Sequence, residues 1–313
     1  MILCCGEALI DMLPRTLEAG EPAFMPVAGG AVFNTAIALA RLGAPAGFLG
    51  GLSTDGFGDM LARALVRSGV DIGLSARSGL PTTLAFVTLV DGQASYMFYD
   101  ENSAGRMVSA DRLPAIPATV AAMHFGAISL AGEPCGAAYE RLALREAKNR
   151  VISIDPNIRP GFAIDESAYR ARLQRMMAVA DIVKVSDADL QWLAPSLPFE
   201  EFAASLLSRA ASLVLLTRGA QGARAAIRGA TVQWDAVPAT VVDTVGAGDT
   251  FNAGILAGLC EAGLLSRERL RAITSDALRP ALALAAEAAA LTVSRAGANP
   301  PFRHEIGTGI RAS

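Results

Sequence analysis

The segment DTVGAGDTFNAGILAGL, residues 243–259, places an acid and several glycines at the expected start of a helix. Gly246 and Gly248 permit a tight turn, and a helix start leaves its first amides without acceptors. Such amides attract anions. Asp249 beside them is either a partner of the helix dipole or a base that faces a phosphoryl acceptor. The alternative for the whole segment is a glycine-rich loop that opens an ordinary core helix.

Two other glycine-rich motifs are excluded here. A dinucleotide-binding GxGxxG motif requires glycine at the position of Phe251. A Walker A loop requires a lysine after glycine, and neither Lys148 nor Lys184 follows one. Any anion at this loop is therefore expected to be held by backbone amides.

A second group of polar residues lies near the N-terminus. Asp11 follows the first expected strand, Gly29 and Gly30 permit close approach of a ligand, and Asn34 stands at an expected helix start. A carboxylate and an amide that both donates and accepts are suited to sugar hydroxyls. The alternative is a pair of turn glycines followed by an asparagine N-cap.

The elements that position these residues follow an alternating pattern. Short apolar runs alternate with helical patterns, which indicates βα units and a mostly parallel sheet. We expect one domain over residues 1–313, with ligands at the carboxyl ends of the strands. Strands are predicted at 2–10, 46–52, 151–158, 182–186 and 213–219, and helices at 34–43, 55–70 and 281–293.

Two stretches, 12–27 and 82–107, do not fit this pattern. The second contains alternating segments on either side of Asp91-Gly92, which predicts a β-hairpin with a type I′ turn. We expect the two stretches to form a small separate sheet that acts as a lid.

Composition excludes several classes of protein. The chain has 313 residues, is 52% hydrophobic and carries a net charge of -3, so it can bury a large core. Without a basic cluster, nucleic acid is not an expected partner. No apolar run reaches the length of about 18 residues that spans a membrane, and no basic leader precedes the first apolar run, so we expect a cytoplasmic protein. The four cysteines form no CxxC pair, so the sequence gives no sign of a zinc site or a thioredoxin-like redox motif. With two histidines it also gives no sign of a histidine-based catalytic triad.

The order of the motifs resembles that of the ribokinase-like (PfkB) carbohydrate kinases. Their N-terminal signature is similar to GGAVFNTAIALARLG followed by GGLSTDGFGDMLARALVRSGVD, and their C-terminal signature is similar to DTVGAGDTFNAGILAGL. The family's other segments match, in the usual order, GEALIDMLP, HFGAIS, DPNIRPGF, DIVKVSDADLQWL, LLTRGAQGA and SRAGANPP. Within the family these segments are most similar to bacterial fructokinases. The resemblance implies a Rossmann-like three-layer α/β/α core with a β-sheet lid. It also implies phosphorylation of a sugar's primary hydroxyl by ATP with Mg²⁺.

The resemblance also implies roles for individual residues. Asp249 would take the hydroxyl proton, while the amides of Gly246, Ala247 and Gly248 would hold the phosphoryl charge, each worth about 3 kcal/mol by analogy with oxyanion holes. The sugar would be bound by Asp11, Gly29, Gly30, Asn34 and Arg159, with Phe98 as its cover. The nucleotide side would be lined by Lys184, Thr217, Gly219 and Gly222.

Two cation sites are implied as well. The family's Asn-x-x-Glu motif, which organises Mg²⁺, is replaced here by Ser186 and Asp189, so we expect Asp189 to act through water. A potassium ion would be held by Asp243, Val245, Arg295 and Gly297. Pro301 stands where ribokinase has a serine, which weakens the prediction for potassium.

Fructose is the expected substrate, and 2-keto-3-deoxygluconate is the first alternative, followed by other sugars or nucleosides. Asp100 and Glu101 at the end of the lid would repel a sugar acid, whereas Arg106 would counter them. A silent sugar sensor or a scaffold is the alternative from another class. The intact Asp249 favours the kinase. The lid could also pair with a second copy, which predicts a homodimer.

Overall fold

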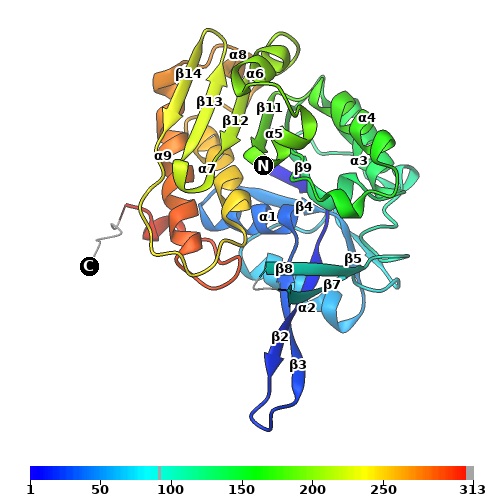
Figure 1. Ribbon diagram of the computed structural model, residues 1–313. Helices are drawn as coiled ribbons and strands as arrows, with labels where there is room; N and C mark the ends of the chain where they lie inside the picture. The colour runs from blue at the N-terminus through cyan, green and yellow to red at the C-terminus, as the bar shows by residue number, and fades with distance from the viewer. Residues whose placement is uncertain (91–92, 308–313) are drawn as a thin grey trace.

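The centre of the computed structural model, which describes residues 1–90 and 93–307, is an eight-stranded sheet (Figure 1). Its strands are β1 Ile2–Cys5, β4 Ala46–Leu49, β9 Ala122–Gly126, β10 Val151–Asp155, β11 Ile182–Ser186, β12 Leu213–Thr217, β13 Ala223–Ile227 and β14 Ala230–Trp234. They lie in the order β14-β13-β12-β11-β10-β9-β1-β4. The pairs from β12 to β4 are parallel, and only β13 and β14 join this sheet antiparallel. The expected mostly parallel sheet is confirmed.

Helices cover both faces of this sheet. Successive residues of β1 point to opposite sides: Ile2 and Cys4 enter one hydrophobic cluster, and Leu3 and Cys5 enter the other. The first cluster is completed by α1 Ala31–Arg41, α2 Gly56–Arg67, α7 Ala247–Glu261, α8 Arg267–Arg271 and α9 Ser275–Val293. The second is completed by α3 Cys135–Glu146, α4 Glu166–Met177, α5 Asp187–Leu193 and α6 Phe199–Leu207. The result is the three-layer arrangement that the resemblance to PfkB kinases implies.

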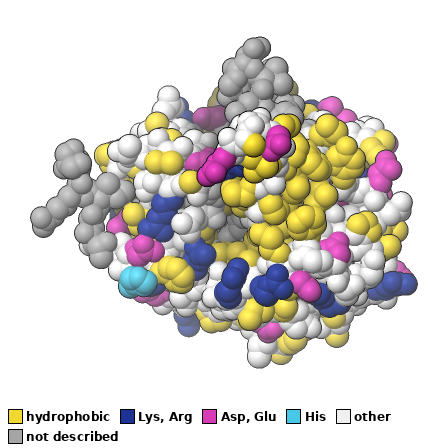
Figure 2. Space-filling model, turned by 90° about the horizontal axis from the view of Figure 1, so that it is seen from below, with side chains coloured by type: hydrophobic (Ala, Val, Ile, Leu, Met, Phe, Trp, Pro, Cys, Tyr) yellow, Lys and Arg dark blue, Asp and Glu magenta, His cyan; other side chains and the backbone are white. Residues whose placement is uncertain are grey.

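A separate four-stranded sheet, which we call the lid, lies beside this core. Its strands are β2 Leu9–Thr16, β3 Pro22–Gly29, β7 Leu84–Val90 and β8 Gln93–Tyr99, in the order β3-β2-β7-β8. The β2–β3 hairpin projects from the body in Figure 1, and hydrophobic side chains gather in a broad patch when the molecule is viewed from that side (Figure 2). A short third sheet pairs β5 Gly51–Ser53 with β6 Ala76–Ser78. The turn predicted at Asp91-Gly92 lies outside the described residues.

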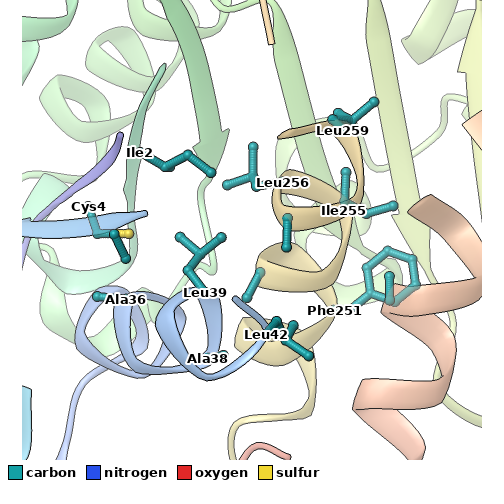
Figure 3. Packing of buried hydrophobic residues seen from close by; sticks show 14 of the residues in the cluster. Ile2, Cys4, Ala36, Ala38, Leu39, Leu42, Phe251, Ile255, Leu256 and Leu259 are labelled. Carbon is teal, nitrogen blue, oxygen red and sulfur yellow. The ribbon is translucent and has the colours of Figure 1, made fainter. Parts of the chain in front are cut away.

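Helix α7 is fixed between two neighbouring helices. Figure 3 shows Leu39 of α1 and Leu256 of α7 lying close together near Ile2 of β1, and all three belong to one buried cluster. On the other side a Cβ at Gly254 would lie 2.3 Å from Ala285 Cα, so only glycine lets α7 approach α9 this closely. The first turn of α7 is therefore held in a fixed position.

The structure corrects two predicted boundaries near the N-terminus. The single strand expected over 2–10 is broken into β1 and β2 at residues 6–8. The chain turns there because the buried Glu7 carboxylate accepts a hydrogen bond of 3.1 Å from the amide of Val32, in the first turn of α1. Helix α1 begins after Gly30, whose φ is 109°, so Asn34 is not its N-cap. Within residues 1–90 and 93–307, no helix has the length and hydrophobicity needed to cross a membrane.

Candidate active site

The start of α7 forms an open backbone turn. Gly246 is its N-cap with a φ of 78°, and a Cβ at this position would lie 2.7 Å from the Cβ of Ala298. Both facts require glycine. No side chain among the described residues caps this helix start. The first-turn amides of Ala247 and Gly248 thus lie at the positive end of a fifteen-residue helix, which favours an anion.

Asp249 lies in this first turn and is buried, with 8% of its surface exposed. Asn34 Nδ2 donates a hydrogen bond of 2.9 Å to Asp249 Oδ2. Burial raises the pKa of Asp249 to about 7, although the bond from Asn34 lowers it. A carboxyl group with this pKa gains and loses its proton near neutral pH, as a general base must.

A small cleft surrounds Asp249 at the carboxyl ends of β9 and β10. It is lined by Ala31, Val32, Thr35, His124, Gly126, Ala127, Asp155, Asn157 and Asp249. Burial, with the nearby charge of Lys184, lowers the pKa of His124 to about 3, so this histidine is neutral at physiological pH. Asp249 therefore has a pKa near 7 in this cleft, and burial also raises the pKa of Asp155, which lines the cleft beside it.

Asp11 lies on lid strand β2, against the chain that leads into α1. Its register partners are Val27 on β3 and Ala85 on β7, and Ala85 pairs in turn with Phe98 on β8. Residues directly opposite each other point to the same face, so Asp11 and Phe98 share one face of the lid. A Cβ at Gly29 would lie 2.2 Å from Asp11 Oδ2, which places the carboxylate against the chain that leads into α1. Burial raises the pKa of Asp11 to about 6, so the carboxylate is mostly ionised at pH 7.

The loop after β10 connects the lid to the core. The ring of Phe98 meets that of Phe162 edge to face, with 5.0 Å between centroids. Arg159 is exposed; its Nη1 donates to the carbonyl of Ile158 over 3.0 Å, and it forms no ion pair with the described residues. Asp189 anchors the same loop, since its Oδ1 accepts a hydrogen bond of 2.7 Å from the amide of Ile158. Its Oδ2 accepts from the amide and hydroxyl of Ser186.

A cavity of about 540 Å³ lies beside the start of α7. Thr217, Gly219 and Gly222 line it together with Ala247 and Gly248. Part of its wall is not indicated by any of the predicted motifs. This part is formed by Ala286, Ala289, Ala290 and Val293 of α9 and by the segment Trp234, Asp235, Ala236, Val237, Pro238 and Ala239. The helical spacing of those small residues on α9 was the available signal.

Lys184 does not line this cavity. Its side chain is buried, and Nζ forms an ion pair of 3.0 Å with Asp155 Oδ2. Glu7 is a further buried charge near the site that the sequence analysis missed. Its carboxylate faces the first turn of α1, which also carries Asn34, and burial raises its pKa.

The residues predicted to hold potassium lie on two loops joined by Asp243. Its Oδ1 accepts a hydrogen bond of 3.0 Å from the amide of Val245, and its Oδ2 accepts one of 2.9 Å from the amide of Gly297. The Arg295 side chain forms an ion pair with Glu305 instead of entering the site. Among the described residues, no group of three or more His, Cys, Asp or Glu side chains is placed to bind a metal ion.

The fold is that of a ribokinase-like kinase, and comparison with known proteins agrees. The sequence model of the pfkB family of carbohydrate kinases matches residues 1–305. The chain is 52% identical to a fructokinase of Rhizobium leguminosarum bv. trifolii over 89% of this chain and 86% of that protein. It is 38% identical to fructokinase-1 of Zea mays over 82% of each. The crystal structure of a fructokinase with bound ATP from Xylella fastidiosa superimposes with a TM-score of 0.88 and 31% identity, covering 95% of this chain and 93% of that one. This chain belongs to the pfkB family of carbohydrate kinases.

Proposed function

We propose that this chain transfers the γ-phosphoryl group of ATP to the primary hydroxyl of fructose, which yields fructose 6-phosphate and ADP. The observation that carries the proposal is the buried Asp249, held by Asn34 at an uncapped helix start, with the 540 Å³ cavity on one side and the small polar cleft on the other. The identity of 52% to a fructokinase supports the choice of sugar.

Separate groups of residues bind the sugar, remove its proton, stabilise the phosphoryl charge and bind the nucleotide in this proposal. The sugar lies between the cleft and the lid, where Asp11, Gly29, Gly30, Asn34 and Arg159 bind it and Phe98 covers it. Asp249 removes the proton of the attacking hydroxyl. The amides of Gly246, Ala247 and Gly248 stabilise the negative charge on the transferred group, because phosphoryl transfer depends mainly on alignment and charge stabilisation. The nucleotide occupies the 540 Å³ cavity, against Thr217, Gly219 and Gly222.

Two cations complete the proposed site. Mg²⁺ neutralises phosphate charge when it is bound with ATP. Asp189 is buried and its oxygens are bonded to the amides of Ile158 and Ser186, so we propose that it acts on Mg²⁺ through water. Potassium would be held by Asp243 and by carbonyl groups of Val245, Arg295 and Gly297. The Asp243 carboxylate joins the two loops that supply those groups, which supports the proposal.

The lid favours a neutral sugar over the sugar acid 2-keto-3-deoxygluconate. Arg106, the cation that would receive a substrate carboxylate at the lid, forms an ion pair of 3.2 Å with Asp100. Asp100 also accepts hydrogen bonds from Thr83 and Ser103, so the pair is fixed. An arginine neutralised in this way attracts a second carboxylate only weakly.

We also propose a homodimer that forms through the lid, in the cytoplasm where ATP is available. The outer face of the lid exposes Phe24, Met97 and Tyr99, which are 43%, 55% and 58% exposed. Exposed apolar side chains gathered on one sheet face are typical of an interface. A second copy of the chain is the occupant that this proposal names.

The decisive experiment is an ADP-release assay with Mg-ATP and each of fructose, ribose, 2-keto-3-deoxygluconate and adenosine, with and without K⁺. Fructose should give the highest kcat/KM. Faster turnover of the sugar acid would replace fructose as the assigned substrate. Binding of fructose without release of ADP would instead identify a sensor.

A further inference from the structure

A buried ion pair lies directly behind the glycine-rich turn. Lys184 on β11 and Asp155 at the end of β10 are 4% and 3% exposed, and their Nζ and Oδ2 atoms are 3.0 Å apart. Asn252, in the second turn of α7, donates a hydrogen bond of 2.6 Å to the same Asp155 oxygen. The pair therefore links two central strands to the helix that carries Asp249.

The ammonium group of Lys184 lies close to the turn itself. A Cβ built on Gly248 would be 3.3 Å from Lys184 Nζ, and among the described residues no other atom outside the neighbouring residues and the backbone of α7 comes within 4 Å of that point. Asp155 also lines the cleft around Asp249, and its Oδ1 is buried without a hydrogen-bond partner in the described structure. One positive and one negative charge are thus fixed on the core side of the reaction site.

We propose that Lys184 is a positioning residue for the reaction: its ammonium group, held by Asp155 behind Gly248, lowers the pH at which Asp249 becomes a base. This inference rests on the proposed role of Asp249. Lys184 favours the ionised form of Asp249 by attraction, and Asp155 opposes it by repulsion. In a buried site little water screens either effect.

The charges around Asp249 support this assignment. Burial raises the pKa of Asp249 most, and the hydrogen bond from Asn34 lowers it. Among the nearby charges, Asp155 and Glu7 raise this pKa, whereas Lys184 lowers it. His124 on β9 is neutral, and Asn34 and Thr35 on α1 contribute uncharged hydrogen bonds. Burial opposes the charged form of Lys184, but the carboxylates of Asp155, Asp189 and Asp249 raise its pKa above the ordinary value. Lys184 is therefore a cation throughout the working range of pH.

The first test is the pH profile of kcat/KM for the sugar. Lys184→Met should move the acid limb to higher pH by about one pH unit, and Asp155→Asn should move it to lower pH by a similar amount. Lys148 is the other lysine of the chain and is exposed, so Lys148→Met should leave the acid limb of the pH profile in place. A merely structural role would lower the whole profile without moving its midpoint. That result, or shifts of the same sign in both variants, would overturn the proposal.

A second measurement leaves both residues of the ion pair unchanged. It therefore tests the coupling between Lys184 and Asp249 even if Lys184→Met does not fold. In Lys148→Met protein labelled with ¹³Cε-lysine, Lys184 gives the only lysine signal. Because the coupling between two charges is reciprocal, that signal should shift with the midpoint at which Asp249 titrates. Adding Asp249→Asn should abolish this transition. A signal that does not respond between pH 5 and 9, or a transition that survives Asp249→Asn, rejects the inference. This readout needs no substrate, so it is independent of the proposed sugar and of turnover.

Discussion

In the proposed mechanism Asp249 combines two opposing properties, since it is buried and yet must ionise to act as a base. The variant Asp249→Asn keeps the shape and the contact with Asn34 but cannot accept a proton. We expect it to bind ATP and fructose with nearly unchanged affinity and to lose roughly 10²- to 10⁴-fold in kcat, the usual contribution of a general base. Calorimetric titration and an ADP-release assay measure the two effects separately. Turnover within threefold of the wild type would remove Asp249 from the mechanism.

The same residue should make stability depend on pH. In the unfolded chain an aspartate titrates near 3.9, whereas burial raises the pKa of Asp249 to about 7 in the folded protein. The folded state thus holds the proton more tightly, so ionisation of Asp249 destabilises the fold progressively from about pH 4 to pH 7. Asp249→Asn should therefore raise the melting temperature at pH 8 relative to the wild type and change it less at pH 4. An equal change at both pH values would contradict the raised pKa.

Residue types at the site are predictable from the sequence, but their contacts are not. Gly246, Gly248 and Asp249 follow from one local motif. The bond between Asn34 and Asp249 joins positions 215 residues apart, and no local pattern indicates it. Lys184 illustrates the same limit. A lysine at a strand end is usually exposed, and only the neighbouring strand shows that this one is paired with Asp155.

At the scale of elements, the turn before α7 depends on a backbone shape that glycine alone adopts easily. Gly246→Ala should distort the turn, since the new Cβ would meet Ala298 and a φ of 78° is strained for alanine. We expect kcat to fall at least tenfold. Gly229→Ala is the matched control: its φ of 80° is equally strained, but in the described part of the chain nothing beyond its two neighbours would lie within 4 Å of the new Cβ. The control should lose about 1–2 kcal/mol of unfolding free energy and keep its turnover. Equal kcat in the two variants would separate the turn from catalysis.

Helix α9 contributes a wall of small residues to the 540 Å³ cavity. Ala289→Leu places a larger side chain in that wall, so the KM for ATP should rise at least tenfold while the KM for fructose changes little. Ala283→Leu, on an exposed position of the same helix, should change neither. Steady-state kinetics with each substrate varied in turn distinguish these outcomes. A normal KM for ATP in Ala289→Leu would place the nucleotide elsewhere.

Elements with a continuous apolar pattern are found from the sequence, and elements shaped by tertiary contacts are not. The predicted runs at 151–158, 182–186 and 213–219 contain β10, β11 and β12. These strands are easy to recognise because a strand that is covered on both faces is apolar along its whole length. The break between β1 and β2 was missed because Glu7 turns inward to an amide 25 residues away. A charged residue within an apolar run was the available sign of that break.

At the scale of the whole molecule, the two faces of the lid carry different chemistry. Asp11 and Met12 are consecutive on β2 and point to opposite faces. Asp11 shares its face with Phe98, whereas Met12 shares the outer face with Phe86 and Met97. On that outer face the ring of Phe86 lies 4.9 Å from Phe24 and 5.5 Å from Tyr99, measured between centroids. A partner molecule can therefore cover the outer face without blocking the sugar.

This division makes the proposed dimer testable apart from catalysis. Met97→Glu places a charge at the centre of the exposed apolar face, and burying that charge against a second copy is strongly unfavourable. Analytical ultracentrifugation should show a dimer for the wild type and a dissociation constant raised on the order of 100-fold or more for Met97→Glu. Leu144→Glu on α3, where the leucine is 40% exposed, should remain dimeric. Because the dimer would support the strands that hold Asp11, the monomeric variant should also show a raised KM for fructose with kcat less affected. A wild type that remains monomeric at high concentration, or equal dissociation of both variants, would exclude the lid as the interface.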